Sequence, residues 1–132
     1  MSLRVLIADD SAMARMFLKR CLEATGLPCE VREAVNGREA LDLLLLEPAD
    51  VLITDLVMPV MDGEELLRQV KDDPLTAGVQ VVVVSSASNE SRRDRLIVMG
   101  AKAVLEKPLS PSNLAAVLQQ ESGDSWGEGE WA

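Results

Sequence analysis

Histidine is absent from the 132-residue sequence, and aromatic residues make up only 2% of it. Without imidazole, the chain cannot supply a histidine-dependent catalytic triad or a histidine metal ligand of its own. With so few rings, a core has to be built from Val, Leu, Ile, Ala and Met, a composition common in helix-covered parallel sheets. A chain of this length fits one domain of ordinary size.

Cysteine and positive charge are also scarce. Cys21 and Cys29 are too few for a disulfide framework or a zinc site, which favours free thiols, a buried Cys21 and a reducing, cytoplasmic setting. The formal net charge is −9, and no Lys/Arg cluster is long enough to follow a phosphate backbone. We therefore expect neither direct nucleic-acid binding nor docking on an anionic membrane. No apolar run approaches the roughly 20 residues that span a bilayer, and no signal peptide is recognisable.

Short β-rich apolar segments alternate along the chain with longer segments of helical period. Strands are expected at residues 5–8, 30–34, 51–53, 81–84 and 103–105. A helix is expected after each strand, with Ser11, Asn36 and Ser110 as N-caps and further starts near Asp62 and Glu90. Five strands that alternate with five helices predict a parallel sheet wound on both faces, because each right-handed crossover needs a helix to return the chain.

Helical spacing also predicts which residues face the core. The apolar face of the first helix is expected to consist of Met13, Met16, Phe17, Cys21 and Ala24. The expected faces of three later helices are Ala40, Leu41, Leu44 and Leu45, then Leu66, Leu67 and Val70, then Leu114, Val117 and Leu118. Residues 4–121 are expected to form the domain. Residues 122–132, rich in Gly and acid, are expected to be a disordered tail or the start of a linker, with two Trp residues as a conceivable docking element.

Polar side chains follow four of the five expected strands. They are Asp9 and Asp10, then Asp55, then Ser85 and Ser86, and finally Lys107. In a doubly wound sheet, ligands bind beyond the carboxyl ends of the strands, so we expect these groups at one edge of the sheet. Three carboxylates repel one another unless a cation joins them. Mg²⁺ suits such a site, because it prefers oxygen ligands and binds through one or two carboxylates plus a substrate phosphate.

Each of these residues also has an ordinary structural explanation when taken alone. An Asp pair after a strand is more often loop punctuation or helix capping than a metal site. Asp55 could begin a turn that leads to Pro59, Lys107 could be a solvated lysine, and either serine could merely end its strand. The coincidence of two acidic positions, a hydroxyl and a base at the same end of four strands is what favours a functional site.

The motifs resemble those of response-regulator receiver domains of two-component signalling, chemotaxis regulators included, over about residues 4–120. The segments that carry the resemblance are Ile7-Ala8-Asp9-Asp10-Ser11, Asn36-Gly37-Arg38-Glu39-Ala40-Leu41, Asp55-Leu56-Val57-Met58-Pro59-Val60-Met61-Asp62-Gly63, Ser85-Ser86-Ala87, Gly100-Ala101 and Lys107-Pro108. The resemblance implies a flavodoxin-like α/β fold: a doubly wound, five-stranded parallel sheet of order 2-1-3-4-5 with five helices.

The resemblance also implies a metal site and a phosphoacceptor. Asp55 would take a phosphoryl group from the phosphohistidine of a sensor histidine kinase or a phosphotransfer protein. Mg²⁺, or Mn²⁺, would be bound directly by Asp10, Asp55 and the backbone carbonyl of Val57. Asp9 would act through a metal-bound water. Such a transfer works by positioning and charge neutralisation, with little covalent work for the protein.

Further roles follow from the same resemblance. Lys107 would pair with a phosphoryl oxygen, and Pro108 would follow a cis peptide bond. Ser85, favoured over Ser86 by its spacing to Gly100, would hydrogen-bond the phosphoryl group. A face made of the fourth helix, the fifth strand and the fifth helix would meet an unknown downstream protein or output domain through residues that include Lys102, Val104 and Glu106.

Two departures from the family pattern bear on switching and lifetime. Val104 stands where the family commonly has Tyr or Phe, and a valine cannot swing between exposed and buried positions as a large ring can. Val57 and Ala87, two residues beyond Asp55 and Ser85, are apolar and cannot orient an attacking water. We therefore expect no aromatic switch and slow self-dephosphorylation.

The expected function is thus a phosphorylation-controlled signalling module that catalyses only its own phosphorylation and slow dephosphorylation. One alternative is a phosphohydrolase with an Asp nucleophile, similar to haloacid-dehalogenase-like enzymes. Those carry a second Asp two residues after the nucleophile, where this sequence has Val57, so the proton donor is missing. Another alternative is a receiver-like interaction module that is never phosphorylated, and the complete acidic set argues against it.

Overall fold

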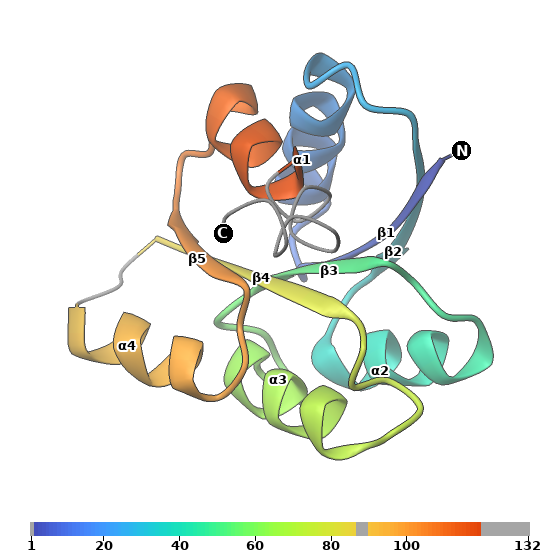
Figure 1. Cartoon of the computed structure of the whole chain (residues 1–132), viewed down its shortest axis with the longest axis vertical. Coiled ribbons are helices and arrows are strands. Elements are labelled where there is room, and N and C mark those ends of the chain that lie inside the picture. Colours follow the sequence, from blue (N-terminus) through green and yellow to red (C-terminus); the bar gives the residue numbers. More distant parts are fainter. Residues whose placement is uncertain (1, 87–89, 120–132) are drawn as a thin grey trace, which may run out of the picture.

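The computed structural model describes residues 2–86 and 90–119, in which helices cover both faces of one sheet (Figure 1). The strands are β1 (Leu3–Ala8), β2 (Cys29–Ala34), β3 (Val51–Asp55), β4 (Gln80–Ser85) and β5 (Ala103–Glu106). The helices are α1 (Ala12–Ala24), α2 (Gly37–Leu46), α3 (Gly63–Asp72), α4 (Glu90–Val98) and a last helix over residues 111–119. The predictions for residues 122–132 and for Ala87 lie outside the described residues.

The sheet has the order β2-β1-β3-β4-β5, and all its neighbouring strands pair in parallel. This confirms the predicted fold class and strand order. The registers align the strand ends, because Ala8 pairs with Thr54 and Asp55 pairs with Val84. The chain winds outward in one direction through β1 and β2 and in the other through β3, β4 and β5, so the switch point lies between β1 and β3.

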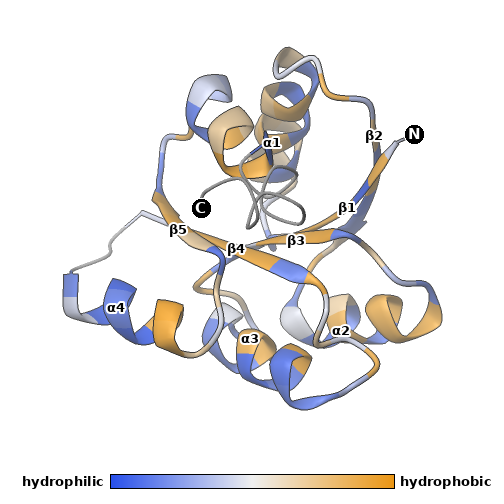
Figure 2. Cartoon of the chain, viewed as in Figure 1, coloured by the Kyte–Doolittle hydropathy of each residue, from blue (hydrophilic) through white to orange (hydrophobic). Residues whose placement is uncertain are grey.

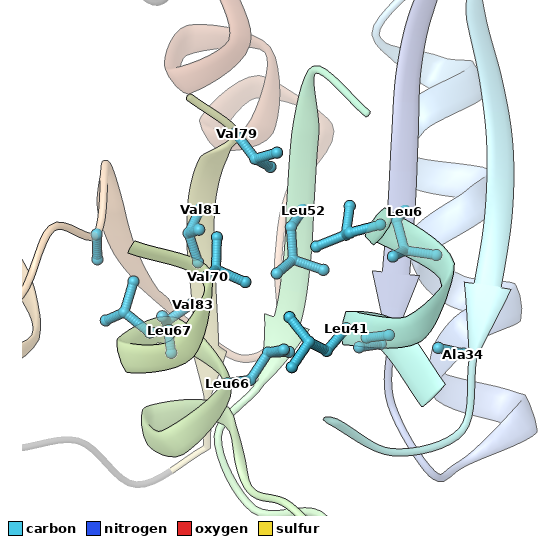
Figure 3. Packing of buried hydrophobic residues seen from close by; sticks show 14 of the residues in the cluster. Leu6, Ala34, Leu41, Leu52, Leu66, Leu67, Val70, Val79, Val81 and Val83 are labelled. Atoms are coloured by element: carbon cyan, nitrogen blue, oxygen red, sulfur yellow. The ribbon is translucent and has the colours of Figure 1, made fainter. Parts of the chain in front are cut away.

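Two apolar layers flank the sheet. Side chains alternate along each strand, so that Leu6 and Leu52 face α2, α3 and α4, whereas Ile7 and Ile53 face α1 and the last helix. Figure 3 shows the first layer, in which Leu41, Leu66 and Leu67 reach across to the strands. Figure 2 shows the sheet as a hydrophobic band between helices of mixed character. Burial on both faces explains why these strands are continuous Val, Leu and Ile runs.

The predicted N-caps are confirmed. The Ser11 Oγ accepts a hydrogen bond from the Ala14 N–H at 3.1 Å, and the Asn36 Oδ1 accepts one from the Glu39 N–H at 2.8 Å. The Ser110 Oγ accepts one from the Asn113 N–H at 3.1 Å. Each cap satisfies an N–H that would otherwise have no partner in the first helical turn.

The predicted apolar face of α1 is wrong in its first half. Met13, Met16 and Phe17 are 79%, 50% and 47% exposed. The core-facing residues of α1 are Leu18, Cys21 and Leu22, and Ala24 is exposed. The helix carries apolar residues on two adjoining stripes, and spacing alone cannot tell which stripe the sheet covers.

A similar ambiguity affects α2, in which Leu41 and Leu44 are buried but Leu45 is 45% exposed. The face predicted for α3 is confirmed, with Leu66, Leu67 and Val70 fully buried. In the last helix Leu114 and Leu118 are buried, while Val117 is partly buried against them. Among the helices of the described residues, none has the length and apolar character needed to cross a bilayer.

Candidate functional site

Three carboxylates meet at the carboxyl edge of the sheet. Asp9 and Asp10 follow β1, Asp55 ends β3, and one carboxylate oxygen from each lies within 4.8 Å of the others. They meet because β1 and β3 are adjacent, parallel and in register up to the pair Ala8 and Thr54. Asp9 is buried, Asp55 is partly buried and Asp10 is exposed, so the cluster opens to solvent on the Asp10 side.

Lys107 brings a positive charge to the same cluster. Its Nζ lies 3.5 Å from the Asp9 Oδ2 and 3.4 Å from the Asp55 Oδ1. The Lys107 N–H donates to the Ser85 carbonyl at 2.9 Å, which ties the chain after β5 to the end of β4. The predicted cis peptide bond between Lys107 and Pro108 is present. The structure thus gathers the acids and the base into one site.

The site carries more negative than positive charge. Burial, and then the charge of Asp9, raise the pKa of the Asp55 carboxyl above its ordinary value, although Lys107 and the Leu56 N–H oppose this. The Asp9 Oδ2 is buried and, within the described part of the chain, accepts no hydrogen bond, its contact with Lys107 being an ion pair at 3.5 Å. A divalent cation with oxygen ligands would relieve both conditions, so this donor set fits Mg²⁺ or Mn²⁺.

The loop of residues 56–62, between β3 and α3, folds back tightly beside Asp55. The Leu56 N–H donates to the Asp55 Oδ1 at 2.8 Å, and the Gly63 N–H donates to the Leu56 carbonyl at 2.8 Å. A Cβ on Gly63 would lie 2.2 Å from the Asp55 carbonyl oxygen. Only glycine therefore fits there, because real Cβ contacts do not approach that distance. Val57, the predicted carbonyl ligand, lies in this loop and is 75% exposed.

A second glycine, Gly37, contacts the same loop from the start of α2. The Gly37 N–H, at the start of α2, donates to the Met61 carbonyl at 3.0 Å. A Cβ on Gly37 would lie 2.4 Å from that oxygen. Gly37 and Gly63 both stood in the family motifs, but nothing in the sequence indicated these close approaches. Val60 adopts a φ of 71° in the loop, which is unusual for a β-branched residue.

The remaining predicted residues lie nearby with different exposure. Ser85 is the last residue of β4 and is 3% exposed, whereas Ser86 is exposed. Val104 is 3% exposed and belongs to the core. Its place on an accessible partner-binding face is therefore a wrong prediction, since its side chain points into the sheet's apolar layer. By contrast, Lys102 directly precedes β5 and is partly exposed, and Glu106 is the exposed last residue of β5.

An apolar groove of about 670 Å³ adjoins the acidic cluster. Asp9 and Lys107 line part of it, and Met13, Met16 and Phe17 of α1 line another part. The exposed apolar side chains of α1 are therefore gathered beside the site.

The chain is similar to known signalling proteins. The model of the response regulator receiver domain matches residues 5–119. The chemotaxis protein CheY of Thermotoga maritima is 33% identical over 123 residues, which cover 92% of this chain and 99% of that protein. The sensor histidine kinase TmoS of Ectopseudomonas mendocina is 36% identical over 113 residues, which cover 86% of this chain but only 11% of the kinase.

A solved structure agrees with these relatives. The signal receiver domain of a DNA-binding response regulator from Colwellia psychrerythraea 34H superposes with a TM-score of 0.81 at 30% identity, covering 92% of this chain and 98% of that one. The fold, the acidic cluster at its switch point and the relatives agree, and the chain belongs to the response regulator receiver domain family of two-component signalling.

Proposed function

We propose that Asp55 is the phosphoacceptor and that Asp10, Asp55 and the Val57 carbonyl hold Mg²⁺ or Mn²⁺ directly, with Asp9 acting through a metal-bound water. The observation that carries the proposal is the joint position of three carboxylates within 4.8 Å and the Lys107 ammonium 3.4 Å from Asp55. Asp55 is the member of the cluster that contacts Lys107 and is still partly open to solvent.

In the proposed reaction, a carboxylate oxygen of Asp55 attacks the phosphorus of a phosphohistidine. A P–O bond forms, the P–N bond breaks, and its electron pair goes to the imidazole nitrogen of the donor. Lys107 pairs with a phosphoryl oxygen, for which a point charge suffices, and the Ser85 hydroxyl donates to another. The metal, when bound, neutralises charge on the carboxylates and the phosphoryl group.

The same residues support a long-lived acyl phosphate. Val57 is apolar and 75% exposed, so it offers neither a proton donor nor a hydrogen-bonding group to an attacking water. We infer that the domain catalyses its own phosphorylation and only slow dephosphorylation. An acyl phosphate that decays within seconds would contradict this inference.

The phosphodonor is proposed to be a sensor histidine kinase or a phosphotransfer protein that docks on α1. Its phosphohistidine has to reach Asp55, and the apolar groove runs from the site to Met13 and Phe17. A partner helix with apolar side chains would cover this surface while it presents the phosphoryl group.

The free thiols of Cys21 and Cys29 support a reducing, cytoplasmic location. The downstream protein or output domain is proposed to contact α4, β5 and the last helix.

The test is incubation with Mg²⁺ and phosphoramidate, followed by intact mass measurement. We expect one phosphate adduct on the wild type, none on Asp55→Asn, and none when EDTA replaces Mg²⁺. Asp42→Asn is the matched control, because Asp42 is a carboxylate on α2 that pairs with Arg38 and does not belong to the acidic cluster. An adduct that persists in Asp55→Asn, or a wild type that takes up no phosphate, contradicts the proposal.

A further inference from the structure

Arg15, in the first turns of α1, reaches back to the loop that carries the acid pair. Its Nη1 donates to the Asp9 carbonyl oxygen at 2.7 Å, and its Nε donates to the Glu33 Oε1 at 2.7 Å. The side chain is only 15% exposed. One guanidinium therefore joins three elements, namely the end of β1, helix α1 and strand β2.

The far end of this connection is firmly held. Glu33 also accepts a hydrogen bond from the Lys19 Nζ at 2.8 Å. The hydrogen bonds from Lys19 and then Arg15 lower the pKa of the Glu33 carboxyl below its ordinary value, so this carboxyl is ionised at neutral pH. Glu33 pairs in register with Ile7 of β1, which fixes it relative to the loop that Arg15 contacts.

Asp10 depends on this loop for its direction. Within residues 2–86 and 90–119, its side chain makes no hydrogen bond or ion pair, whereas the Asp9 Oδ1 accepts the Ser11 N–H at 2.9 Å. The Asp9 carbonyl belongs to the peptide plane that joins Asp9 to Asp10. When Arg15 holds that oxygen, it fixes the plane from which the Asp10 Cα–Cβ bond extends, so that rotation about the Asp10 N–Cα bond is the backbone freedom that remains.

We propose that Arg15 is a positioning residue for the metal site: by holding the Asp9 carbonyl from an anchor on β2, it aims the Asp10 carboxylate at Asp55. The inference rests on the proposed function, in which Asp10 is a direct metal ligand. Arg15 touches neither metal nor phosphate in this role, and it acts through the backbone. Partners that orient metal ligands commonly matter by 10–100-fold in metal affinity.

The positive charge of Arg15 should weaken Mg²⁺ binding, whereas its proposed positioning of Asp10 should strengthen it. Removal of a nearby positive charge should by itself strengthen the binding of a divalent cation. Loss of the aimed carboxylate should weaken it. Arg15→Met therefore distinguishes the two effects, because loss of the charge predicts tighter Mg²⁺ binding and loss of positioning predicts weaker binding. Arg15→Lys keeps the charge and loses the two-pronged contact, because an ammonium on a shorter reach cannot serve both oxygens in the same geometry.

The experiment is calorimetric titration of the metal-free protein with MgCl₂ for the wild type, Arg15→Lys, Arg15→Met and the control Arg20→Met. We expect about tenfold weaker Mg²⁺ binding in both Arg15 variants. Arg20 is exposed on the same helix, so Arg20→Met removes the same charge and should leave the affinity unchanged or slightly stronger. Equal affinity in Arg15→Lys and the wild type, or tighter binding in Arg15→Met, overturns the inference.

A second measurement on metal-free protein detects the positioning itself. We expect faster amide hydrogen exchange at Asp10 and Ser11 in Arg15→Lys, at a temperature at which unfolding experiments show every variant to be folded. Unchanged exchange there, with a lower unfolding midpoint alone, means that Arg15 merely stabilises the fold and overturns the inference. If the wild type itself binds no Mg²⁺ and takes up no phosphate, the proposed function fails first.

Discussion

The two loops that carry the proposed metal ligands are built in different ways. The first, residues 9–11, is held by side chains: the Asp9 carboxylate accepts the Ser11 N–H, and Arg15 donates to the Asp9 carbonyl. The second, residues 56–62, is held by backbone groups at two glycines, since the Gly63 N–H donates to the Leu56 carbonyl and the Gly37 N–H to the Met61 carbonyl. One loop depends on polar side chains and the other on the absence of side chains.

The two loops should therefore respond differently to substitution. A side-chain contact can be removed one hydrogen bond at a time, and the loop that it held can relax. A glycine contact is steric, so an added Cβ has to displace the backbone itself. We therefore expect larger effects of substitution at the second loop than at the first, and the following predictions test this order.

The largest loss is expected for Gly63→Ala. The new Cβ would lie 2.2 Å from the Asp55 carbonyl oxygen, so strand end and loop must separate, at a cost of about 3 kcal/mol in the free energy of unfolding. Gly78→Ala is the matched control, because a Cβ there meets no heavy atom within 4 Å. Urea denaturation measures both. Equal stability of the two variants would show that the loop adapts to the added Cβ and is not held sterically at Gly63.

Asp55→Asn, at the point where the two loops meet, should stabilise the metal-free protein. Burial and the Asp9 charge raise the pKa of Asp55 in the folded state. Stability linked to a raised pKa is fully present below the ordinary value of about 3.9 and is lost as pH rises through the folded value. At neutral pH the ionised Asp55 is therefore a net cost, which Asn removes while its Oδ1 still accepts the Leu56 N–H.

Thermal unfolding in EDTA checks the sign. We expect a higher midpoint for Asp55→Asn than for the wild type at pH 7, and a difference that shrinks towards pH 4. Added Mg²⁺ should raise the wild-type midpoint more than that of the variant, because binding to the folded state alone is stabilising. A variant that is less stable than the wild type in EDTA at pH 7 would contradict the assigned electrostatics.

Helix N-caps, the acidic residues of the site and a buried strand could be predicted from the sequence, for physical reasons. Ser11 and Asn36 were identifiable as N-caps because their oxygens act within three residues along the chain. Asp9, Asp10 and Asp55 were identifiable because parallel strands end at one edge, so sequence position implies spatial position. Val81 to Val84 were identifiable as a strand buried on both faces, because a continuous β-branched run is typical of such strands.

The contacts and the burial that could not be predicted depend on partners far away in the sequence. Arg15, Lys19 and Arg20 look alike on α1, and only the position of β2 decides that Arg15 and Lys19 meet Glu33. Phe17 and Leu22 are both apolar, and only the packing of α1 on the sheet decides that Leu22 is buried and Phe17 half exposed. The face of α3 was easier, because Leu66, Leu67 and Val70 form a single apolar stripe among charged residues.

A moderate loss is expected at the first loop for Ser11→Ala. The Ser11 Oγ accepts the Ala14 N–H at 3.1 Å, and removal of such an N-cap costs about 1 kcal/mol. Urea denaturation should give this value, well below the loss for Gly63→Ala. Ser11→Asp should recover it, because its carboxylate can accept the same N–H. A loss as large as that of Gly63→Ala would mean that the first loop is no more adaptable than the second.

The smallest change is expected for Val60→Gly and, like that for Asp55→Asn, it is a gain in stability. Val60 has a φ of 71°, where a β-branched residue is strained by about 1–2 kcal/mol. Glycine removes this strain, but its greater freedom in the unfolded chain returns about 0.5–1 kcal/mol, so the net gain should stay below about 1 kcal/mol.

Val60→Ala separates the two contributions, since alanine keeps a Cβ in the same region and should gain less than glycine. Calorimetric titration with Mg²⁺ shows whether the strain serves the site. If the loop is held by Gly37 and Gly63 alone, the Val60→Gly variant should be more stable and bind Mg²⁺ as the wild type does. A stabilised variant with weaker Mg²⁺ binding would instead show that the strained residue helps to hold the Val57 carbonyl in place, and the two-glycine description of this loop would be incomplete.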